Sequence, residues 1–480
     1  MSNEQRNERN ANTTNPNTTG TQGMASEPVI SVRDLTVSFA SEAGTVHAVR
    51  GMNFDLYPGK TLGIVGESGS GKSVTSMAIM GLLDKNASVK GSITYHGEEL
   101  LNKSDFEMSE IRGKGIAMVF QDPLSALTPV FSIGDQIKEA LVTHNPKMTE
   151  QQIHDRSIEL MNLVGIPDPE GRLKSFPHEF SGGMRQRVMI AMAIANDPDV
   201  IIADEPTTAL DVTIQAQVLE VLRKAQRETG AAVIFITHDL GVIAGVADDI
   251  VVMYAGRPVE KADVDSIFDH PAMPYTMGLL GAVPRSDRER NSRLVPIPGS
   301  PMNLVNMPKG CPFAPRCPLA TDICHTTEPA MEPVPDRPGQ FVACHRTQEI
   351  VSKGLTFHDV YTVAEAAKSK FAGVPRDERK MVLDVKHMRK TFPLTAGGFL
   401  RRKIGEVKAV DDVTLDVREG ETVALVGESG SGKSTTLMEI MAFKQPQDGE
   451  IEMFGTKLEH KMPREKRREL RSSVQYVFQD

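Results

Sequence analysis

Short apolar runs alternate with helix-like segments in the first half of the chain. The strand-length runs are Thr61–Val65, Val200–Ala203 and Val233–Ile236. The segments with helical character are Gly71–Leu83, Ile153–Val164, Met184–Ala195 and Ile214–Glu228. This alternation predicts an α/β fold with a mostly parallel sheet flanked by helices. Because no run approaches about 18 consecutive apolar residues, we expect no membrane-spanning helix.

An internal repeat organises the chain. The sequence GESGSGKS at Gly66–Ser73 recurs at Gly427–Ser434, and the residues before each copy agree at the same offset. The shorter sequence VFQD, at Val119–Asp122, recurs at Val477–Asp480. A repeat of this length is far too long for the stacked units of a solenoid. We therefore predict two tandem copies of one domain.

Changes in composition suggest the domain boundaries. The N-terminal segment is rich in Asn and Thr and lacks the apolar core of a signal peptide, so we expect a disordered tail and no secretion. A Pro-rich region with all four cysteines separates the copies, and an Ala/Lys-rich stretch with helical character follows it. The expected units are a tail (1–25), a first copy (26–260), an extension (261–346), a linker (347–380) and a second copy (381–480).

The charge balance narrows the class of function. The chain has 54 Lys and Arg against 63 Asp and Glu, which gives a net charge of −9. A protein whose main partner is nucleic acid usually presents a basic face, so we expect no nucleic-acid partner. The run Arg464–Glu469 mixes both signs and is typical of a solvated helix. Four cysteines in 480 residues are too few for a secreted fold held by disulfides.

The repeated octapeptide fits the pattern of a phosphate-binding P-loop. It follows a strand-like run and precedes a helix, as the mechanism requires. Its glycines let backbone N–H groups face phosphate oxygens, and the helix N-terminus adds positive potential. Lys72 would reach the β- and γ-phosphates of a nucleotide, and the Ser73 hydroxyl would ligate Mg²⁺. The predicted nucleotide-binding residues here are Gly66, Glu67, Ser68, Gly69, Ser70, Gly71, Lys72 and Ser73.

Two acidic residues follow the apolar run Val200–Ala203. Asp204 and Glu205 would lie at the carboxyl end of a buried strand, where open α/β sheets bind their ligands. We expect Asp204 to hold Mg²⁺ through water and Glu205 to polarise the attacking water.

Further motifs resemble those of the ATP-binding cassette (ABC) ATPases. Residues Phe180–Arg187, FSGGMRQR, resemble the signature motif, with Phe in the usual Leu position and Met where Gln is common. Gln121 matches the Q-loop, Ala209–Asp211 the D-loop and His238 the switch histidine, all in the family's order. Phe39, upstream of the P-loop, is the candidate aromatic that stacks on adenine.

The resemblance implies the P-loop ABC ATPase fold and a composite ATP site. Two nucleotide-binding domains would dimerise head to tail, with each ATP between one P-loop and the signature motif of the other domain. The implied catalytic residues are Glu205, His238 and Gln121, and the implied Mg²⁺ ligands are Ser73, Gln121 and Asp204. The further residues expected to bind ATP are Phe39, Asp204, Ser181, Gly182, Gly183, Gln186 and Asp211.

The second copy repeats only part of this set. Its matching residues are Gly427, Gly430, Gly432, Lys433, Ser434 and Gln479, and Phe392 corresponds to Phe39. The sequence then ends at Asp480, before any signature motif, Asp/Glu pair or switch histidine. On the family pattern, we expect a fragment or an interrupted gene of a fused two-cassette ATPase, truncated after the second Q-loop.

The four cysteines of the extension are a candidate metal site. Zinc sites usually contain pairs of cysteines two to four residues apart, which are missing here. Four thiolates suit a [4Fe–4S] cluster, and a metal-free module or a zinc site stays as an alternative. The candidate ligands are Cys311, Cys317, Cys324 and Cys344. The segments around Cys311 and at Val295–Pro301 also resemble the C-terminal extension of oligopeptide, dipeptide and nickel importer ATPases, which carries an iron–sulfur cluster in some members.

The resemblance implies the ATP-hydrolysing subunit of an importer of di- or oligopeptides. It would act with integral membrane permease subunits and, through them, an extracytoplasmic solute-binding protein. Its place would be the cytoplasmic face of the plasma (inner) membrane, as a peripheral protein with ATP and Mg²⁺. An importer of nickel or another small solute, and a soluble ABC ATPase unconnected with transport, stay as alternatives. The acidic charge and the cysteine-bearing extension favour an importer over the soluble class.

Overall fold

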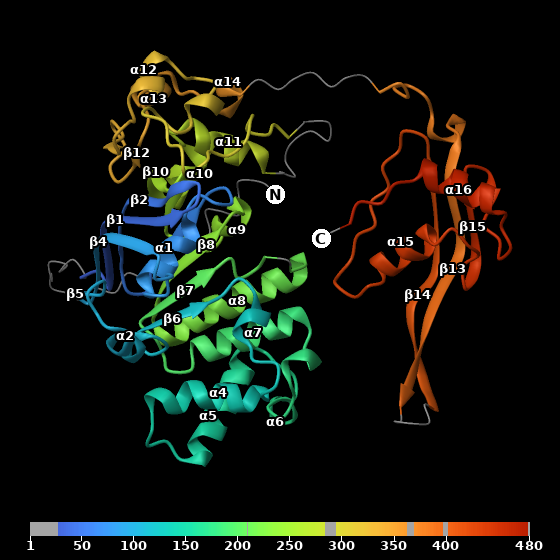
Figure 1. Ribbon diagram of the computed structural model, residues 1–480, viewed down its shortest axis with the longest axis horizontal. Helices are drawn as coiled ribbons and strands as arrows, with labels where there is room; N and C mark the ends of the chain where they lie inside the picture. Colours follow the sequence, from blue (N-terminus) through green and yellow to red (C-terminus); the bar gives the residue numbers. More distant parts are fainter. Residues whose placement is uncertain (1–26, 209, 284–293, 362–368, 397–401, 479–480) are drawn as a thin grey trace, which may run out of the picture.

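The computed structural model describes residues 27–208, 210–283, 294–361, 369–396 and 402–478. Several predicted features lie outside these ranges: the tail 1–25, most of the Ala/Lys-rich stretch, Ala209 and Gln479. Within them, no helix combines the length and the apolar character needed to cross a membrane. Figure 1 follows the chain through the first copy, the extension and the second copy.

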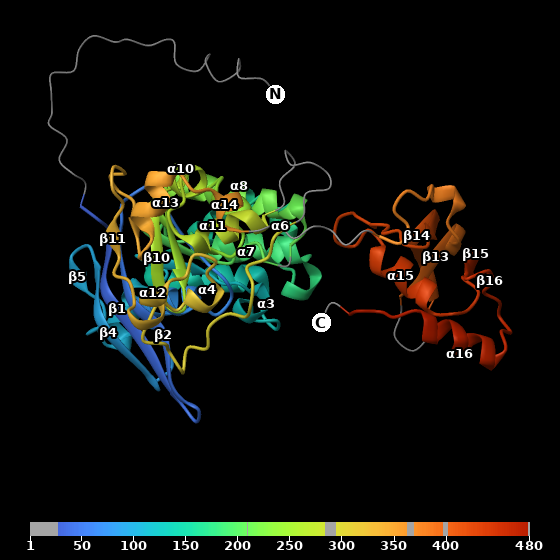
Figure 2. The same cartoon turned by 90° about the horizontal axis from the view of Figure 1, so that it is seen from above.

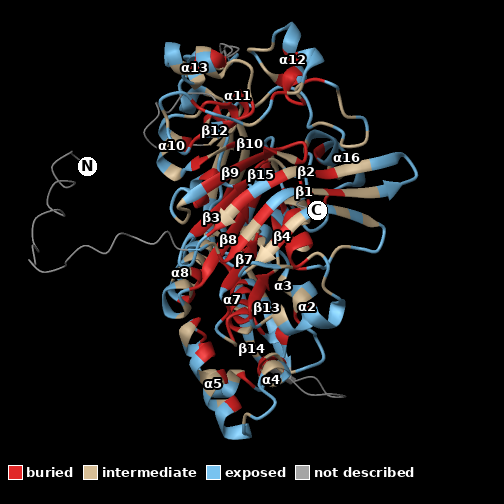
Figure 3. Cartoon of the chain, turned by 90° about the vertical axis from the view of Figure 1, so that its left-hand side faces the viewer, coloured by how far each residue is buried: buried red, intermediate tan, exposed pale blue. Residues whose placement is uncertain are grey.

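An eight-stranded sheet forms the centre of the first copy, in the order β11-β12-β10-β9-β3-β8-β7-β6. Neighbours from β9 to β6 are parallel, and the three apolar runs predicted as strands are among them. Figure 3 shows these strands buried. The α/β fold with a mostly parallel sheet is therefore confirmed. The strands are β3 (Thr61–Val65), β6 (Ile116–Val119), β7 (Val200–Asp204), β8 (Ala232–Thr237), β9 (Asp249–Tyr254), β10 (Arg257–Asp263), β11 (Glu332–Pro333) and β12 (Phe341–Val342).

A smaller antiparallel sheet, in the order β2-β1-β4-β5, lies over one face of the main sheet. Its apolar side chains share one core with two helices and with alternate residues of the main strands, such as Val200 and Ile202. Its strands are β1 (Ile30–Ser41), β2 (Gly44–Leu56), β4 (Ala87–Tyr95) and β5 (Glu98–Glu99). The two helices that share this core are α1 (Lys72–Ile79) and α2 (Asp105–Ile111).

Helices cover the opposite face of the main sheet, where Ile201 and Ala203 point. The longest of them, α8 (Val212–Thr229), begins at an Asp211 cap and ends at Gly230 in the left-handed conformation, both common helix signals. The other helices of the first copy are α3 (Pro123–Ala126), α4 (Ile133–His144), α5 (Glu150–Leu163), α6 (Pro169–Arg172), α7 (Gly182–Ala193) and α9 (Leu240–Ile243), and α10 (Val264–Asp269) follows β10 at the start of the extension.

The extension is joined to the first copy through the main sheet, because β12 pairs with β10. Glu260 in β10 is fully buried, and its carboxylate accepts hydrogen bonds from Ala272 N (2.6 Å) and from Gln340 Nε2 (2.9 Å). Its helices are α11 (Pro274–Ala282), α12 (Asp322–Thr326), α13 (Thr347–Lys353) and α14 (Phe357–Val360).

The start of the predicted linker belongs to this folded unit. Residues 347–361 pack against α11, where Ile350 and Tyr361 share a core with Met277, and the Tyr361 hydroxyl donates to Pro274 O at 2.8 Å. Six of this segment's fifteen residues are apolar, but their spacing does not indicate the helix on which they pack. The boundary expected at residue 346 is therefore not a structural one.

The second copy forms an antiparallel sheet in the order β14-β13-β15-β16 with its own small core. Figures 1 and 2 show it beside the first copy. Its elements are β13 (Met381–Ala396), β14 (Arg402–Arg418), β15 (Asp448–Met453), β16 (Thr456–Lys457), α15 (Lys433–Met441) and α16 (Arg464–Ser473). The mixed-charge run predicted as a solvated helix lies in α16, where only Leu470 is buried among the described side chains.

Two strands of the main sheet, β3 and β6, correspond to residues of the second copy that form no strand; for β6 these are residues 474–477. Residues 421–428, which correspond to β3 and the start of its loop, form no strand. Val426 is 86% exposed, whereas Val65 at the same place in the first copy is fully buried. In the first copy β3 lies between β8 and β9, and no strand in the described part of the second copy supplies such neighbours.

Candidate active site

The first P-loop connects β3 to α1 at the carboxyl edge of the parallel strands. Gly71 has a φ of 99°, and a Cβ atom there would lie 2.2 Å from Ala48 O. Any side chain would therefore be both strained and in collision with β2, which is why glycine is needed at this turn. The loop thereby presents its backbone N–H groups at the N-terminus of α1.

Lys72 lies inside the loop. Its side chain is only 4% exposed, and Nζ donates to Gly66 O (2.9 Å) and Glu67 O (3.1 Å). Burial lowers the pKa of Lys72, while the carboxylates of Glu205 and Asp204 act in the opposite direction. Nζ is 4.0 Å from Glu205 Oε1, so the cation faces the acidic pair across the pocket.

Asp204 and Ser73 form the oxygen-rich part of the site. Asp204 ends β7, and the Ser73 hydroxyl donates to its Oδ1 at 3.0 Å. Burial raises the pKa of the Asp204 carboxyl, and the Ser73 hydrogen bond partly opposes that effect. A hydroxyl beside a buried carboxylate is a donor set that suits Mg²⁺, which prefers hard oxygen ligands.

Glu205 is the point at which the predicted catalytic residues meet. Its Oε2 accepts hydrogen bonds from Gln121 Nε2 (3.0 Å) and Thr208 Oγ1 (2.9 Å), and its Oε1 lies 3.3 Å from His238 Nδ1. The backbone at Glu205 is left-handed, with a φ of 46°, and its N–H donates to Ile236 O at 2.9 Å. Strained backbone of this kind persists where the surrounding structure holds it, often at functional sites. Thr208 was not predicted from the sequence, since a hydroxyl three residues after an acid carries no distinctive pattern.

One pocket of about 910 Å³ is lined by Lys72, Ser73, Gln121, Glu205, Thr208 and His238, and Asp204 adjoins it through its hydrogen bond with Ser73. Phe39 from β1, predicted to stack on adenine, lies in the wall of this pocket. The extension contributes Leu279, Pro301 and Leu304, and Leu304 O accepts a hydrogen bond from His47 N in β2 at 3.1 Å. Sequence reasoning missed these three residues because they lie far along the chain in an irregular segment.

The signature-like segment forms the start of α7. Ser181 is its N-cap, with Oγ accepting from Met184 N at 3.3 Å. A Cβ on Gly182 would meet nothing within 4 Å, whereas one on Gly183 would lie 2.3 Å from Ile214 Cγ2. Gly183 is therefore needed for the packing of α7 on α8, and Gly182 is free to face a ligand. Gln186, predicted to bind ATP, is only 1% exposed and lies in the interior.

Asp211 connects the two copies. Its Oδ1 caps α8 by accepting from Ile214 N at 3.0 Å, and its Oδ2 accepts from Ser429 N at 3.2 Å. Ser429 belongs to the second P-loop, so this D-loop residue contacts that loop and lines no part of the first pocket.

The second P-loop repeats the local geometry of the first. Lys433 Nζ donates to Gly427 O (2.7 Å) and Glu428 O (2.6 Å). Gly430 and Gly432 have the left-handed backbone of Gly69 and Gly71. Ser434 follows in α15, and Phe392, the counterpart of Phe39, is 48% exposed.

The four cysteines of the extension are all free thiols. Burial, together with a smaller effect of the nearby thiols, raises the pKa of Cys317 to about 11 and that of Cys344 to about 12. Backbone N–H groups of Phe313 and Leu319 donate to the sulfurs of Cys311 and Cys317. In the part of the chain that the structure describes, no group of three or more His, Cys, Asp or Glu side chains is arranged to hold a metal ion.

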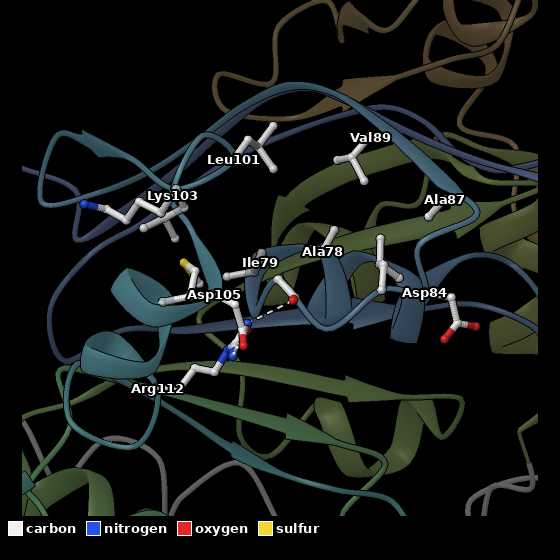
Figure 4. A pocket seen from close by; sticks show the side chains of 13 residues that line it. Ala78, Ile79, Asp84, Ala87, Val89, Leu101, Lys103, Asp105 and Arg112 are labelled. Atoms are coloured by element: carbon white, nitrogen blue, oxygen red, sulfur yellow. Dashed lines mark hydrogen bonds and ion pairs between the residues drawn. The ribbon is translucent and has the colours of Figure 1, made fainter. Parts of the chain in front are cut away.

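A second pocket, of about 270 Å³, lies at the far end of α1 from the P-loop (Figure 4). Arg112 donates to Met80 O (2.8 Å) and Gly81 O (3.0 Å) and pairs with Asp105 at 2.7 Å. These bonds satisfy carbonyl groups at the C-terminal end of α1, which otherwise lack partners. Arg112 is therefore explained by the structure of the fold, and no predicted site residue lines this pocket.

Comparison with known proteins agrees with this geometry. A family described as "ABC transporter" matches residues 49–208 and again residues 410–480. A second family, "Oligopeptide/dipeptide transporter, C-terminal region", matches residues 259–324. The two matches to one family coincide with the two P-loops found from the internal repeat.

Individual relatives carry related names. The chain is 51% identical over 453 residues to the "Oligopeptide transport ATP-binding protein OppD" of Mycobacterium tuberculosis, covering 94% of this chain and 72% of that protein. It is 53% identical over 305 residues to the "Dipeptide transport ATP-binding protein DppD" of Bacillus subtilis, covering 63% of this chain and 90% of that protein. A solved dimer of the ATP-binding cassette MJ0796 with ADP and Pi is 26% identical, covers 49% of this chain and 98% of that chain, and has a TM-score of 0.45.

Proposed function

This chain belongs to the ABC transporter family, and we propose that it couples ATP hydrolysis to the import of di- and oligopeptides. The observation that carries the proposal is the convergence of Lys72 and Glu205 in the pocket beside the first P-loop, with Asp204 hydrogen-bonded to Ser73, which also lines that pocket. Lys72 and the Asp204–Glu205 pair come from different parts of the sequence, and together they supply what phosphoryl transfer to water needs.

The chain's own residues act mainly by position and charge. Lys72 faces the pocket as a buried cation and would stabilise negative charge on the β- and γ-phosphates. Ser73 and Asp204 would hold Mg²⁺, which neutralises charge on the phosphate oxygens when bound. Glu205 would orient the attacking water and accept its proton, while Gln121 and His238 hold that carboxylate from two sides.

We infer that the signature segment serves an ATP bound to another cassette. Ser181 and Gly182 present the open N-terminus of α7, a place that favours an anion. The bond from Ser429 N to Asp211 supports a pairing in which the first copy faces the second P-loop.

The substrate and membrane partners are proposed from the relatives. Those cited are named for oligopeptide or dipeptide transport, and residues 259–324 match a family named for the same solutes. We therefore propose integral membrane permeases, and through them an extracytoplasmic solute-binding protein, as partners at the cytoplasmic face of the plasma membrane.

Deletion of the gene should abolish uptake of a radiolabelled tripeptide by its host and leave Ni²⁺ uptake unchanged. Re-expression of the wild-type chain should restore peptide uptake, and the Glu205→Gln variant should not. The tagged wild-type chain should also carry integral membrane proteins when purified from detergent-extracted membranes. Unchanged peptide uptake after deletion would refute the proposal, and a loss of Ni²⁺ uptake alone would favour the nickel alternative.

We further propose that the four cysteines hold a [4Fe–4S] cluster. The donor set fits in number and in softness, since four free thiols lie in one module and influence one another's pKa. N–H donation to sulfur, present at Cys311 and Cys317, is a feature that tunes such clusters. Because the thiols are not arranged for a metal ion in the described structure, the ligands would have to draw together around the cluster.

Anaerobically purified protein should show a broad absorbance near about 400 nm, typical of a sulfur-ligated iron cluster. Elemental analysis should find about four irons per chain, as a [4Fe–4S] cluster requires. Cys317→Ser should remove the absorbance and lower the iron content, because one of the four sulfur ligands is lost. A colourless wild-type protein without iron would exclude the cluster.

A further inference from the structure

The extension reaches into the first P-loop through one ion pair. Arg316, which immediately precedes Cys317, places both of its terminal nitrogens on the carboxylate of Glu67, the second residue of the loop. The distances are 2.7 Å from Nη1 to Oε2 and 2.9 Å from Nη2 to Oε1. The Arg316 side chain is only 5% exposed. A bidentate pair of this kind holds position as well as charge.

Contacts from the extension and from β9 of the first copy keep Arg316 in place. Its Nε donates to Pro298 O at 2.8 Å, and Nη1 also lies 3.3 Å from the Tyr254 hydroxyl. The guanidinium stands over the rings of Tyr254 and Phe313, at 5.8 and 5.9 Å from their centroids. Arginine stacked and hydrogen-bonded in this way has little freedom to move.

The backbone of Glu67 is held from the same side. Its N–H donates to the hydroxyl of Tyr275 in α11 at 2.9 Å, and Tyr275 is fully buried. Glu67 O in turn accepts a hydrogen bond from Lys72 Nζ at 3.1 Å. The residue that the extension grips therefore also contacts the lysine expected to bind phosphate.

We propose that Arg316 is a positioning residue for ATP binding at the first P-loop. By holding Glu67, it fixes the peptide that orients Lys72, so the segment from Cys311 to Cys317 sets the affinity of this site for nucleotide. The inference rests on the proposed ATP binding by the first copy.

Comparison with the second P-loop indicates that the loop sequence alone does not provide the support that Arg316 gives to the first. It has the same eight residues, and Glu428 corresponds to Glu67. Lys433 donates to Glu428 O as Lys72 does to Glu67 O. Across the described residues, no ion pair involves Glu428, whereas Glu67 has Arg316. The two loops therefore have the same sequence, but only the first is held by an ion pair from the extension.

The test measures MgATP affinity by equilibrium dialysis in full-length chains. All of these chains carry Lys433→Ala, so that only binding at the first P-loop is measured. Arg316→Gln should raise the dissociation constant by about ten- to a hundredfold, the range expected when binding groups are slightly misplaced. Arg316→Lys should recover part of the lost MgATP affinity, because lysine restores the positive charge but cannot contact both carboxylate oxygens through two nitrogens. Adding Glu67→Gln to Arg316→Gln should cost little more, since both substitutions break one interaction.

Arg346→Gln is the matched control. Arg346 also holds a carboxylate and a carbonyl within the extension, those of Glu349 and Leu319, and has no bond to the P-loop among the described contacts. The MgATP affinity of the Arg346→Gln variant should equal that of the parent chain with Lys433→Ala alone. Hydrogen exchange of the peptide spanning residues 62–75 should rise in Arg316→Gln and not in Arg346→Gln.

Two results would overturn the inference: unchanged affinity in Arg316→Gln, or faster exchange confined to the extension. If the parent chain binds no MgATP, the proposed ATP binding itself fails, which is a distinct outcome.

Discussion

Glu205→Gln should bind MgATP with nearly unchanged affinity and hydrolyse it at the first site about 10²–10⁴ times more slowly, the usual contribution of a general base. The amide has the size of the carboxylate and can still accept from Gln121 Nε2 and Thr208 Oγ1. It cannot take a proton from water at neutral pH. Phosphate release and ATP affinity, measured on one preparation of the complete transporter, separate the two effects.

The control for this variant is Glu179→Gln. Glu179 accepts a hydrogen bond from Phe176 N at 2.7 Å and lines no part of the nucleotide pocket. Its turnover should match that of the wild-type chain. Normal hydrolysis by Glu205→Gln would show that another group activates the water, and a large loss of ATP affinity would show that Glu205 mainly shapes the pocket.

Lys72→Ala should lose nucleotide affinity at the first P-loop by about ten- to a hundredfold, since hydrogen bonds to charged groups contribute about 1.5–3 kcal/mol. The substitution removes a buried cation that lies 4.0 Å from Glu205 and faces the phosphate pocket. It also leaves Gly66 O and Glu67 O without the donor that they share. Equilibrium binding of MgATP provides the measurement.

Two lysine variants make this result specific. Lys60→Ala removes a lysine that is 57% exposed and pairs with Asp248 on the surface, and it should leave affinity unchanged. Lys433→Ala should weaken binding at the second P-loop and spare the first. If Lys72→Ala binds as tightly as Lys60→Ala, then Lys72 does not contact the phosphates.

Much of the site could be predicted because each motif is short and indicates its own chemistry from neighbouring residues. A glycine-rich loop between a strand and a helix predicts a phosphate cradle, and acids at the end of a buried strand predict a place at the ligand edge of the sheet. The structure brings Glu205, Gln121 and His238 together, although nothing between them in the sequence indicates the distances. Gln186 shows the limit of motif reasoning, because its place in α7 faces the interior.

Contacts between segments that are far apart along the chain could not be predicted from the sequence. Leu304 reaches the wall of the nucleotide pocket from an irregular stretch, and Arg316 reaches Glu67 from within the cysteine segment. An arginine among prolines and cysteines has no periodicity or spacing that would indicate its partner. Residues 347–361 were likewise assigned to a linker, since their apolar side chains do not by themselves indicate α11 as the helix on which they pack.

The sequence by itself determined the class of fold, the two P-loops and the chemical identity of the groups around the phosphate pocket. Short motifs suffice for this, because backbone conformation and side-chain chemistry act over a few residues. Only the tertiary structure decided which groups meet, that the extension holds the first loop and that the second loop lacks this support. It also decided that Thr61–Val65 is a buried strand while residues 421–428 are not, because a strand needs neighbours to satisfy its backbone hydrogen bonds.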